Sequence, residues 1–220
     1  MIKQANLEND LRIEALRKLV NLASFILPVV YYFSTRALVL QILVPLTIAF
    51  LIVDLARFYH GPTAEVFYKI FGVILRKHER DHEAKRLNGA TWFLLAATIC
   101  VYIFPKYIAV TSFAIFSFAD IASALIGRRF GRRKFNNRSL EGTLAFIATA
   151  ALVIALTPKI EYSPAEYLLC FSAAVVGAVA EVLSYNIVDD NIAIPISTGL
   201  SMWLLFLFFQ PLVHLHNYGF

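Results

Sequence analysis

Seven apolar runs, each near the length needed to cross a lipid bilayer, constrain the fold of this chain more than any other feature. A membrane-spanning helix needs about 20 mostly apolar residues, because it must traverse roughly 30 Å of hydrocarbon. Only 16% of the 220 residues are charged, whereas soluble domains hold about 25%. The runs are 19–35, 37–56, 89–104, 107–127, 141–157, 165–184 and 192–213. We therefore predict an all-α integral membrane protein, with about seven transmembrane helices in a single polytopic domain over residues 1–220.

Three polar stretches complete the predicted topology. Residues 1–18 alternate charged side chains with apolar ones, which predicts an amphipathic helix on the cytoplasmic side. Residues 57–88 form the longest polar connection, and their apolar positions from Val66 to Leu75 follow helical spacing. This pattern is typical of a helix lying on the membrane surface, so we predict a cytoplasmic interfacial loop. Residues 127–140 are predicted to form a short, basic cytoplasmic loop.

The Lys and Arg residues are divided unequally between the two predicted sides. With seven spans, 17 of the 20 fall on the side of the N-terminus, and only Arg36, Lys106 and Lys159 fall opposite. Cytoplasmic loops carry such an excess, so the N-terminus is predicted to be cytoplasmic. The same asymmetry accounts for much of the net charge of +5, and no nucleic-acid partner is expected. Basic residues at the inner leaflet also attract anionic membrane lipids.

The other polar residues of the apolar runs gather on this cytoplasmic side. Ser117, Asp120 and Ser123 recur every third residue and so form one stripe on a helix. A charge at membrane depth costs about 2.5–3.5 kcal/mol, so we predict a functional role for Asp120 rather than a structural ion pair with Arg128 or Arg129. The other polar residues near this side are Asp54, Arg57, Asn88, Glu181, Ser184, Asp189, Asp190 and Asn191, and Gly89 follows Asn88 at the start of the third run.

The segment from Gly127 to Gly142 has a composition suited to phosphate. Arginine forks match phosphate oxygens, and glycines let a backbone approach them closely. Ser139 is predicted to cap the next helix, whose N-terminal amides can then face an anion. Plain anchoring by the positive-inside rule is the alternative for the individual cations. The residues predicted to bind phosphate are Arg128, Arg129, Arg132, Arg133, Lys134, Arg138 and Ser139.

A short acidic loop follows the sixth apolar run. Asp189 and Asp190 supply hard oxygen ligands of the kind that Mg²⁺ needs when it accompanies nucleotide phosphates. Glu181, about two helical turns earlier, adds a third carboxylate. Capping of the next helix is the alternative role, because Asp and Asn commonly begin helices.

Several short motifs occur along the chain in a familiar order. They are Arg17-Lys18-Leu19, Asp54 to Arg57, Leu87-Asn88-Gly89, Ser117 to Phe146, Glu181, and Asp189 to Pro195 with Asn191. In this order they resemble the CTP-dependent lipid kinases, a family that includes dolichol kinase, CTP-dependent diacylglycerol kinase and phytol kinase. The resemblance runs from about residue 15 to residue 200. One position departs from it: the family often has a histidine shortly after Arg-Lys, where this chain has Asn21.

The resemblance implies transfer of the γ-phosphate of a nucleotide, typically CTP, to the hydroxyl of a lipid alcohol such as diacylglycerol, dolichol or phytol. It implies catalytic roles for Asp120 and Glu181, Mg²⁺ at Asp189 and Asp190, and nucleotide phosphates on the basic loop. The active face would be cytoplasmic.

Two other functions stay open. A CTP-dependent phosphatidate cytidylyltransferase would also need a basic cytoplasmic face, but no PGHGG…DRxD-like signature follows the basic loop. A transporter would place polar groups near the bilayer midplane and carry repeats, which the sequence lacks. The apolar walls do not distinguish the lipid alcohols, and no base-reading residue distinguishes CTP from ATP.

Overall fold

The computed structural model describes residues 24–59, 61–71, 87–135, 138–184 and 188–209. Its elements are α2 (Ile26–Phe33), α3 (Arg36–Tyr59), α4 (Gly61–Phe71), α5 (Gly89–Ile103), α6 (Lys106–Phe130), β1 (Lys134–Phe135), β2 (Arg138–Ser139), α7 (Leu140–Leu156), α8 (Pro164–Leu183) and α9 (Asp190–Phe208). The two short strands pair antiparallel, with Lys134 opposite Ser139. The described part of the chain is otherwise helical, so the predicted all-helical architecture is confirmed.

Four helices are long and apolar enough to cross a membrane: α3, α6, α8 and α9. Helices α5 and α7 are apolar but have 15 and 17 residues. Helix α2 has 8 residues, about 12 Å at 1.5 Å per residue, which is well short of the bilayer core. The four long helices mark an integral membrane protein. A total of seven spans stays a prediction.

Two helices extend three residues beyond the predicted ends of their spans. Helix α6 continues to Phe130, so Arg128 and Arg129 belong to its last turn rather than to a loop beginning at residue 127. Cations are favoured there by the helix dipole, and Gly131 ends the helix by donating its N–H to Gly127 O at 3.0 Å. Helix α3 likewise continues to Tyr59, three residues beyond its predicted end.

Helix α4 occupies part of the connection in which an amphipathic helix was predicted. It buries Ala64 and Phe67 and exposes Glu65 and Lys69, as such a helix should. Residues 72–86 and the predicted N-terminal helix over 1–18 lie outside the described residues.

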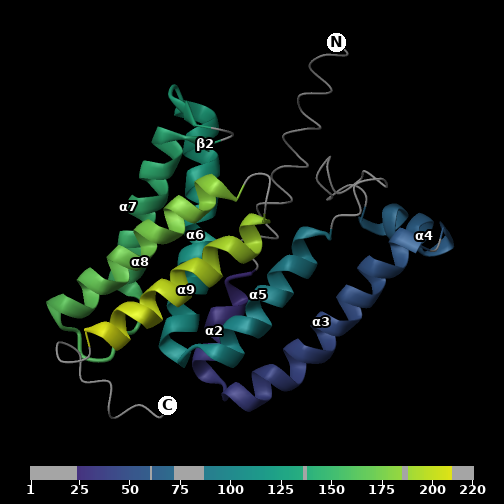
Figure 1. Ribbon diagram of the computed structural model, residues 1–220, viewed down its shortest axis with the longest axis horizontal. Helices are drawn as coiled ribbons and strands as arrows, with labels where there is room; N and C mark the ends of the chain where they lie inside the picture. Colours follow the sequence, from purple (N-terminus) through teal and green to yellow (C-terminus); the bar gives the residue numbers. More distant parts are fainter. Residues whose placement is uncertain (1–23, 60, 72–86, 136–137, 185–187, 210–220) are drawn as a thin grey trace.

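Helix α6 forms the centre of the bundle. It packs against α7, α9, α2 and α5, whereas α3 packs mainly against α5 and α4. In the most apolar stretch of each helix, 78% of the α6 residues are buried but only 22% of the α3 residues. Figure 1 accordingly shows α3 at the edge of the bundle and α6 behind α8 and α9. Side chains of α6 are therefore held by neighbours, while most of α3 is left to face lipid.

The three basic residues assigned to the outer side lie at one end of this bundle. Lys106 Nζ donates to Ser34 O at 2.7 Å, and Arg36 Nη2 donates to Phe104 O at 2.7 Å. Each cation thus satisfies a carbonyl at the end of a neighbouring helix. Lys159 follows α7, whose first residues pack against the last turns of α6, so α7 runs from there toward the other end of α6. The placement of these three residues agrees with the predicted topology, in which they lie on the side opposite the other 17 Lys and Arg residues.

Candidate active site

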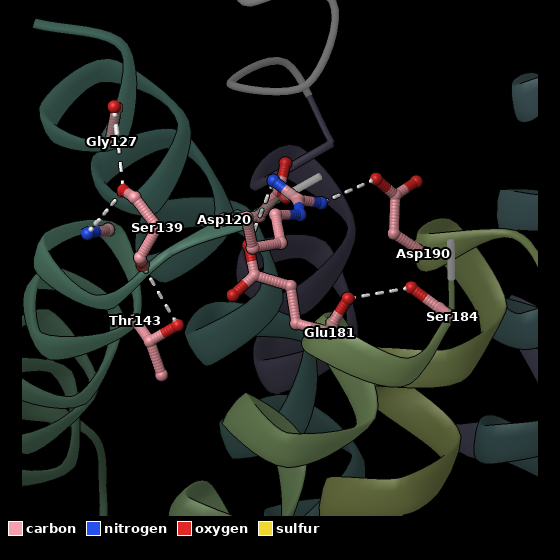
Figure 2. Close-up of polar contacts among 9 residues, drawn as sticks. Asp120, Gly127, Ser139, Thr143, Glu181, Ser184 and Asp190 are labelled. Atoms are coloured by element: carbon pink, nitrogen blue, oxygen red, sulfur yellow. Dashed lines mark hydrogen bonds and ion pairs between the residues drawn. The ribbon is translucent and has the colours of Figure 1, made fainter. Parts of the chain in front are cut away.

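One arginine joins three helices at the opposite end of the bundle. Arg138 of β2 places Nη1 3.0 Å from Glu181 Oε1 of α8 and Nη2 3.0 Å from Asp190 Oδ2 of α9. The same Nη2 lies 3.6 Å from Asp120 Oδ1 of α6. Figure 2 shows Asp120, Glu181 and Asp190 approaching one another from their separate helices. We call these three residues the carboxylate cluster.

The carboxylate cluster is largely removed from solvent. The Glu181 side chain is 0% exposed, and the Arg138 side chain, at 21%, keeps one edge accessible. Within the described residues, neither carboxylate oxygen of Glu181 forms a hydrogen bond, and Oε1 is held by its ion pair with Arg138. With all groups ionised, three carboxylates and one guanidinium leave a net charge of −2. Buried charge of this kind requires neutralisation, so the cluster is a place that attracts cations.

The depth of the carboxylate cluster follows from the helices that carry it. Glu181 lies two residues before the end of α8, and Asp190 is the first residue of α9. Asp120 therefore lies level with two helix ends and not near the middle of the bilayer. Helix α6 continues for ten residues past Asp120, which is about 15 Å. Its last turns and the β1–β2 hairpin that follows therefore lie beyond the level of the carboxylate cluster.

Ser139 caps α7, as the sequence predicted. Its Oγ accepts the Gly142 N–H at 3.1 Å and donates to Gly127 O at 3.4 Å. Figure 2 shows Ser139 between Gly127 and Thr143 at this junction. The cap fixes the residue that follows Arg138, and so fixes the backbone from which Arg138 reaches the cluster.

The glycines of this segment have a different role from the predicted one. A Cβ added at Gly142 would lie 2.8 Å from Ser123 O and 3.2 Å from Gly127 Cα. A Cβ at Gly127 would lie 2.9 Å from Ser139 Oγ. These glycines therefore let α6 and α7 touch, and their presence no longer argues for phosphate. The phosphate prediction rests on the basic side chains and the start of α7.

The six predicted phosphate-binding cations divide into two groups. Arg138 turns inward to the carboxylate cluster. The others are exposed around the end of α6 and at β1, namely Arg128, Arg129, Arg132, Arg133 and Lys134. Sequence reasoning placed all six in one role. For the exposed five, phosphate binding stays a prediction.

The two adjacent aspartates also separate. Asp189 is the N-cap of α9, and its Oδ1 accepts the Asn191 N–H at 2.9 Å and the Asn191 side-chain amide. Asp190 points instead toward Arg138. The described residues contain no group of three or more acidic, His or Cys side chains arranged to hold a metal ion as they stand. The capping alternative is thus realised at Asp189, and Asp190 is the residue directed to the cluster.

A second buried polar group joins the inner ends of α3 and α5. Asp54 Oδ1 pairs with Arg57 Nε at 2.6 Å, and both side chains are 0% exposed. Asp54 Oδ2 accepts the Asn88 N–H at 2.7 Å, and Asn88 Oδ1 accepts the Thr91 N–H and so caps α5 before Gly89. Asp54 and Arg57 are three residues apart and therefore lie on one face of α3. Arg17, Lys18 and Asn21 lie outside the described residues.

Comparison with known proteins gives relatives but no family model and no solved structure that match. An uncharacterised protein of Rickettsia prowazekii is 25% identical over 193 residues, which are 87% of this chain and 94% of that protein. CTP-dependent diacylglycerol kinase 1 of Schizosaccharomyces pombe is 24% identical over 165 residues, 69% of this chain and 74% of that protein. A probable chloroplastic phytol kinase 1 of Oryza sativa subsp. japonica is 28% identical over 134 residues, 54% of this chain and 43% of that protein.

These relatives agree with the motifs. The two that carry functional names are lipid kinases, one a diacylglycerol kinase and one a phytol kinase. The resemblance inferred from the order of the motifs is therefore confirmed: this chain is similar, over as much as 74% of its residues, to CTP-dependent lipid kinases.

Proposed function

We propose that this protein is a membrane-embedded lipid kinase that transfers the γ-phosphate of CTP to the hydroxyl of a lipid alcohol. The observation that carries the proposal is the carboxylate cluster. Acids from α6, α8 and α9 meet Arg138 at the level of two helix ends, beneath exposed basic residues. Such a site can hold a triphosphate on its polar side and meet a lipid hydroxyl on its membrane side.

The proposed topology has seven spans, with the N-terminus and the active face in the cytoplasm. It is supported by the uneven division of Lys and Arg. It is supported as well by the position of Arg36, Lys106 and Lys159 at the end away from the cluster. A cytoplasmic active face would give the enzyme access to nucleotide.

The triphosphate would be bound by the exposed cations of the α6 end and by the start of α7. Phosphoryl transfer is accelerated mostly by positioning and by neutralising charge on the phosphate oxygens. Arginine supplies paired N–H donors for these oxygens, and the N-terminus of α7 presents its positive dipole end. Arg128, Arg129, Arg132, Arg133 and Lys134 are the side chains proposed for this role.

The carboxylate cluster fits a divalent cation because it offers hard oxygen donors that already surround a positive group. When bound, Mg²⁺ would neutralise phosphate oxygens and make the transferred phosphorus more electrophilic. Glu181 and Asp190, both 3.0 Å from the guanidinium, are the proposed ligands. Asp189, engaged as a cap, is the weaker candidate of the two predicted aspartates.

Asp120 is the proposed general base. At 3.6 Å it is the carboxylate held least closely by Arg138, and it projects from the central helix. It would accept the proton of the lipid hydroxyl as the oxygen–phosphorus bond forms. The bond between the β–γ bridging oxygen and the γ-phosphorus breaks, and CDP leaves with its electron pair.

The named relatives suggest the acceptor class. One is described as a diacylglycerol kinase and the other as a probable phytol kinase, and both substrates are lipid alcohols. We propose an uncharged lipid alcohol here as well, because its hydroxyl can lie at the interface beside Asp120. A polyprenol such as dolichol belongs to the same class.

The deciding experiment uses purified protein, Mg²⁺, a panel of lipid alcohols with phosphatidate, and CTP labelled at either the α or the γ position. Label from the γ position in a lipid monophosphate is the expected result. Label from the α position in a CDP-lipid would instead identify a cytidylyltransferase. Parallel reactions with ATP and GTP identify the donor, and absence of any product with all three nucleotides would contradict the kinase proposal.

A further inference from the structure

We propose that Arg138 holds the position of a divalent cation while no nucleotide is bound, and that the two exchange when the metal–nucleotide complex arrives. The inference rests on the proposed function and deepens it. Its starting point is that the guanidinium lies between the carboxylates of the two proposed metal ligands. Glu181 and Asp190 each approach it at 3.0 Å, from different helices.

The charge of the carboxylate cluster supports an exchange. Asp120, Glu181 and Asp190 come from three helices that must pack together whether or not a ligand is present. Three carboxylates brought together without a cation would repel one another, and burial would increase the cost. Arg138 keeps the helices assembled in the absence of metal. The same guanidinium would repel a divalent cation that arrived alone.

The attachment of Arg138 makes its movement feasible. The next residue, Ser139, is fixed by hydrogen bonds to Gly142 N and Gly127 O, so the backbone can stay in place. The arginine side chain is long, and it is 21% exposed rather than sealed into the core. A guanidinium displaced from the carboxylates would find new acceptors in the phosphate oxygens of the arriving nucleotide, which it matches bidentately.

The consequence is an order of binding. Without nucleotide, the site should bind divalent cations poorly, because the guanidinium competes for the same oxygens. With Mg²⁺–CTP, the phosphates receive Arg138 and the metal takes the vacated position. Metal would then enter only together with nucleotide, which ties cation binding to the presence of substrate.

The test is a titration of the full chain in detergent micelles with Mn²⁺ and no nucleotide, followed by electron paramagnetic resonance. We expect weak Mn²⁺ binding to the wild type and binding at least about tenfold tighter to Arg138→Gln, since a unit positive charge is removed from the site. Arg132→Gln removes the same charge from the same basic segment but from an exposed side chain. It should stay within about threefold of the wild type, because exposed charges are screened.

Two further variants separate the cation position from a general change in charge. Arg138→Lys keeps a positive charge, and we expect it to bind Mn²⁺ as weakly as the wild type. The double variant Arg138→Gln/Glu181→Gln should lose the gain, because one proposed ligand is absent. Wild-type protein that binds Mn²⁺ as tightly as Arg138→Gln would overturn the inference, and so would an Arg138→Gln protein without any gain.

Folding is monitored in the same preparations by thermal unfolding. Mg²⁺ alone should raise the melting temperature of Arg138→Gln and leave that of the wild type unchanged. Should Arg138→Gln fail to fold, the wild-type titration and the Arg138→Lys titration decide the matter. Both must then show weak binding, and a tight nucleotide-free Mn²⁺ site in either protein refutes the exchange.

The labelled-CTP assay keeps this inference apart from the proposed function. If the wild-type protein phosphorylates a lipid alcohol and also binds Mn²⁺ tightly without nucleotide, the proposed function is supported and the exchange of Arg138 for the metal is refuted. If the proteins show the expected Mn²⁺ binding but the wild type makes no lipid monophosphate, the cation position is supported and the lipid kinase activity is refuted.

Discussion

Replacing Gly142 by alanine should separate α6 from α7 and thereby displace Arg138. The added Cβ would lie 2.8 Å from Ser123 O, a helical backbone atom that cannot rotate away, and 3.1 Å from Ser139 Oγ. Alanine gains at most about 1 kcal/mol in helix propensity over glycine. Overpacking costs about 1–3 kcal/mol, and disturbing the Ser139 cap costs about 1 kcal/mol more. We expect a net loss of about 1–3 kcal/mol.

Gly61→Ala is the matched control for this change. A Cβ at Gly61 meets no atom within 4 Å, so the same substitution there should leave stability unchanged or slightly higher. Any loss that is specific to Gly142 then reports the α6–α7 contact and not the loss of a glycine as such.

Two buried cysteines supply the assay. Cys100 and Cys170 are free and 0% and 1% exposed, so a thiol-reactive fluorophore will label them only as the protein unfolds. A loss of about 1–3 kcal/mol corresponds to a fall of roughly 2–12 °C in melting temperature for a chain of this size. If Gly142→Ala has the same melting temperature as the wild type, close contact between α6 and α7 at Gly142 does not contribute to stability as argued.

Three further predictions are checked by the same thermal-unfolding assay and by transfer of the labelled γ-phosphate from CTP to a lipid alcohol. Asp120→Asn should abolish transfer while melting close to the wild type, and retained activity would remove Asp120 from the role of base. Asp190→Asn should lose most transfer, whereas Asp189→Asn should keep it because asparagine is also a good N-cap; equal losses would place a ligand at both positions. Glu166→Gln should lower stability by about 1–3 kcal/mol without a specific loss of transfer, because its buried carboxylate accepts three backbone N–H groups at the end of α8 away from the carboxylate cluster.

Hydropathy located the described helices because the length of an apolar run is a local property of the sequence. It failed at the end of α6 that carries the basic residues. Arg128 and Arg129 resemble a loop by hydropathy, yet α6 includes them because its dipole favours cations in the last turn. It also could not decide how many helices span the membrane, since α2, α5 and α7 are all shorter than about 20 residues.

Local spacing predicted part of the polar structure. Asp54 and Arg57 are three residues apart, so their pairing follows from helix geometry. Ser163 caps α8 by accepting the Glu166 N–H, a signal that is visible in the sequence, whereas the Glu166 carboxylate accepts the N–H groups of 160–162. Both pairs depend on neighbours within one turn of helix.

The partners of Arg138 could not be predicted in this way. They lie 18, 43 and 52 residues distant along the chain, on three separate helices. Among six neighbouring cations, sequence alone does not say which one turns inward. The buried carboxylates select Arg138 because β2 places it next to them, and neutralising desolvated acids matters more than exposing one further cation to phosphate.

The height of α6 relative to its neighbours explains how one site can serve a water-soluble and a lipid substrate. The carboxylate cluster lies where α8 ends and α9 begins, while α6 extends about 15 Å further. Two of the five exposed cations are in the last turn of α6, and the other three follow its end, up to and including the first residue of β1. Figure 1 shows the end of α7 near β2 standing beyond the ends of α8 and α9. A triphosphate held by these cations would lie above the acids, and a lipid hydroxyl would reach Asp120 from the apolar side below. The γ-phosphate would then lie between them, so transfer would require neither substrate to leave its own phase.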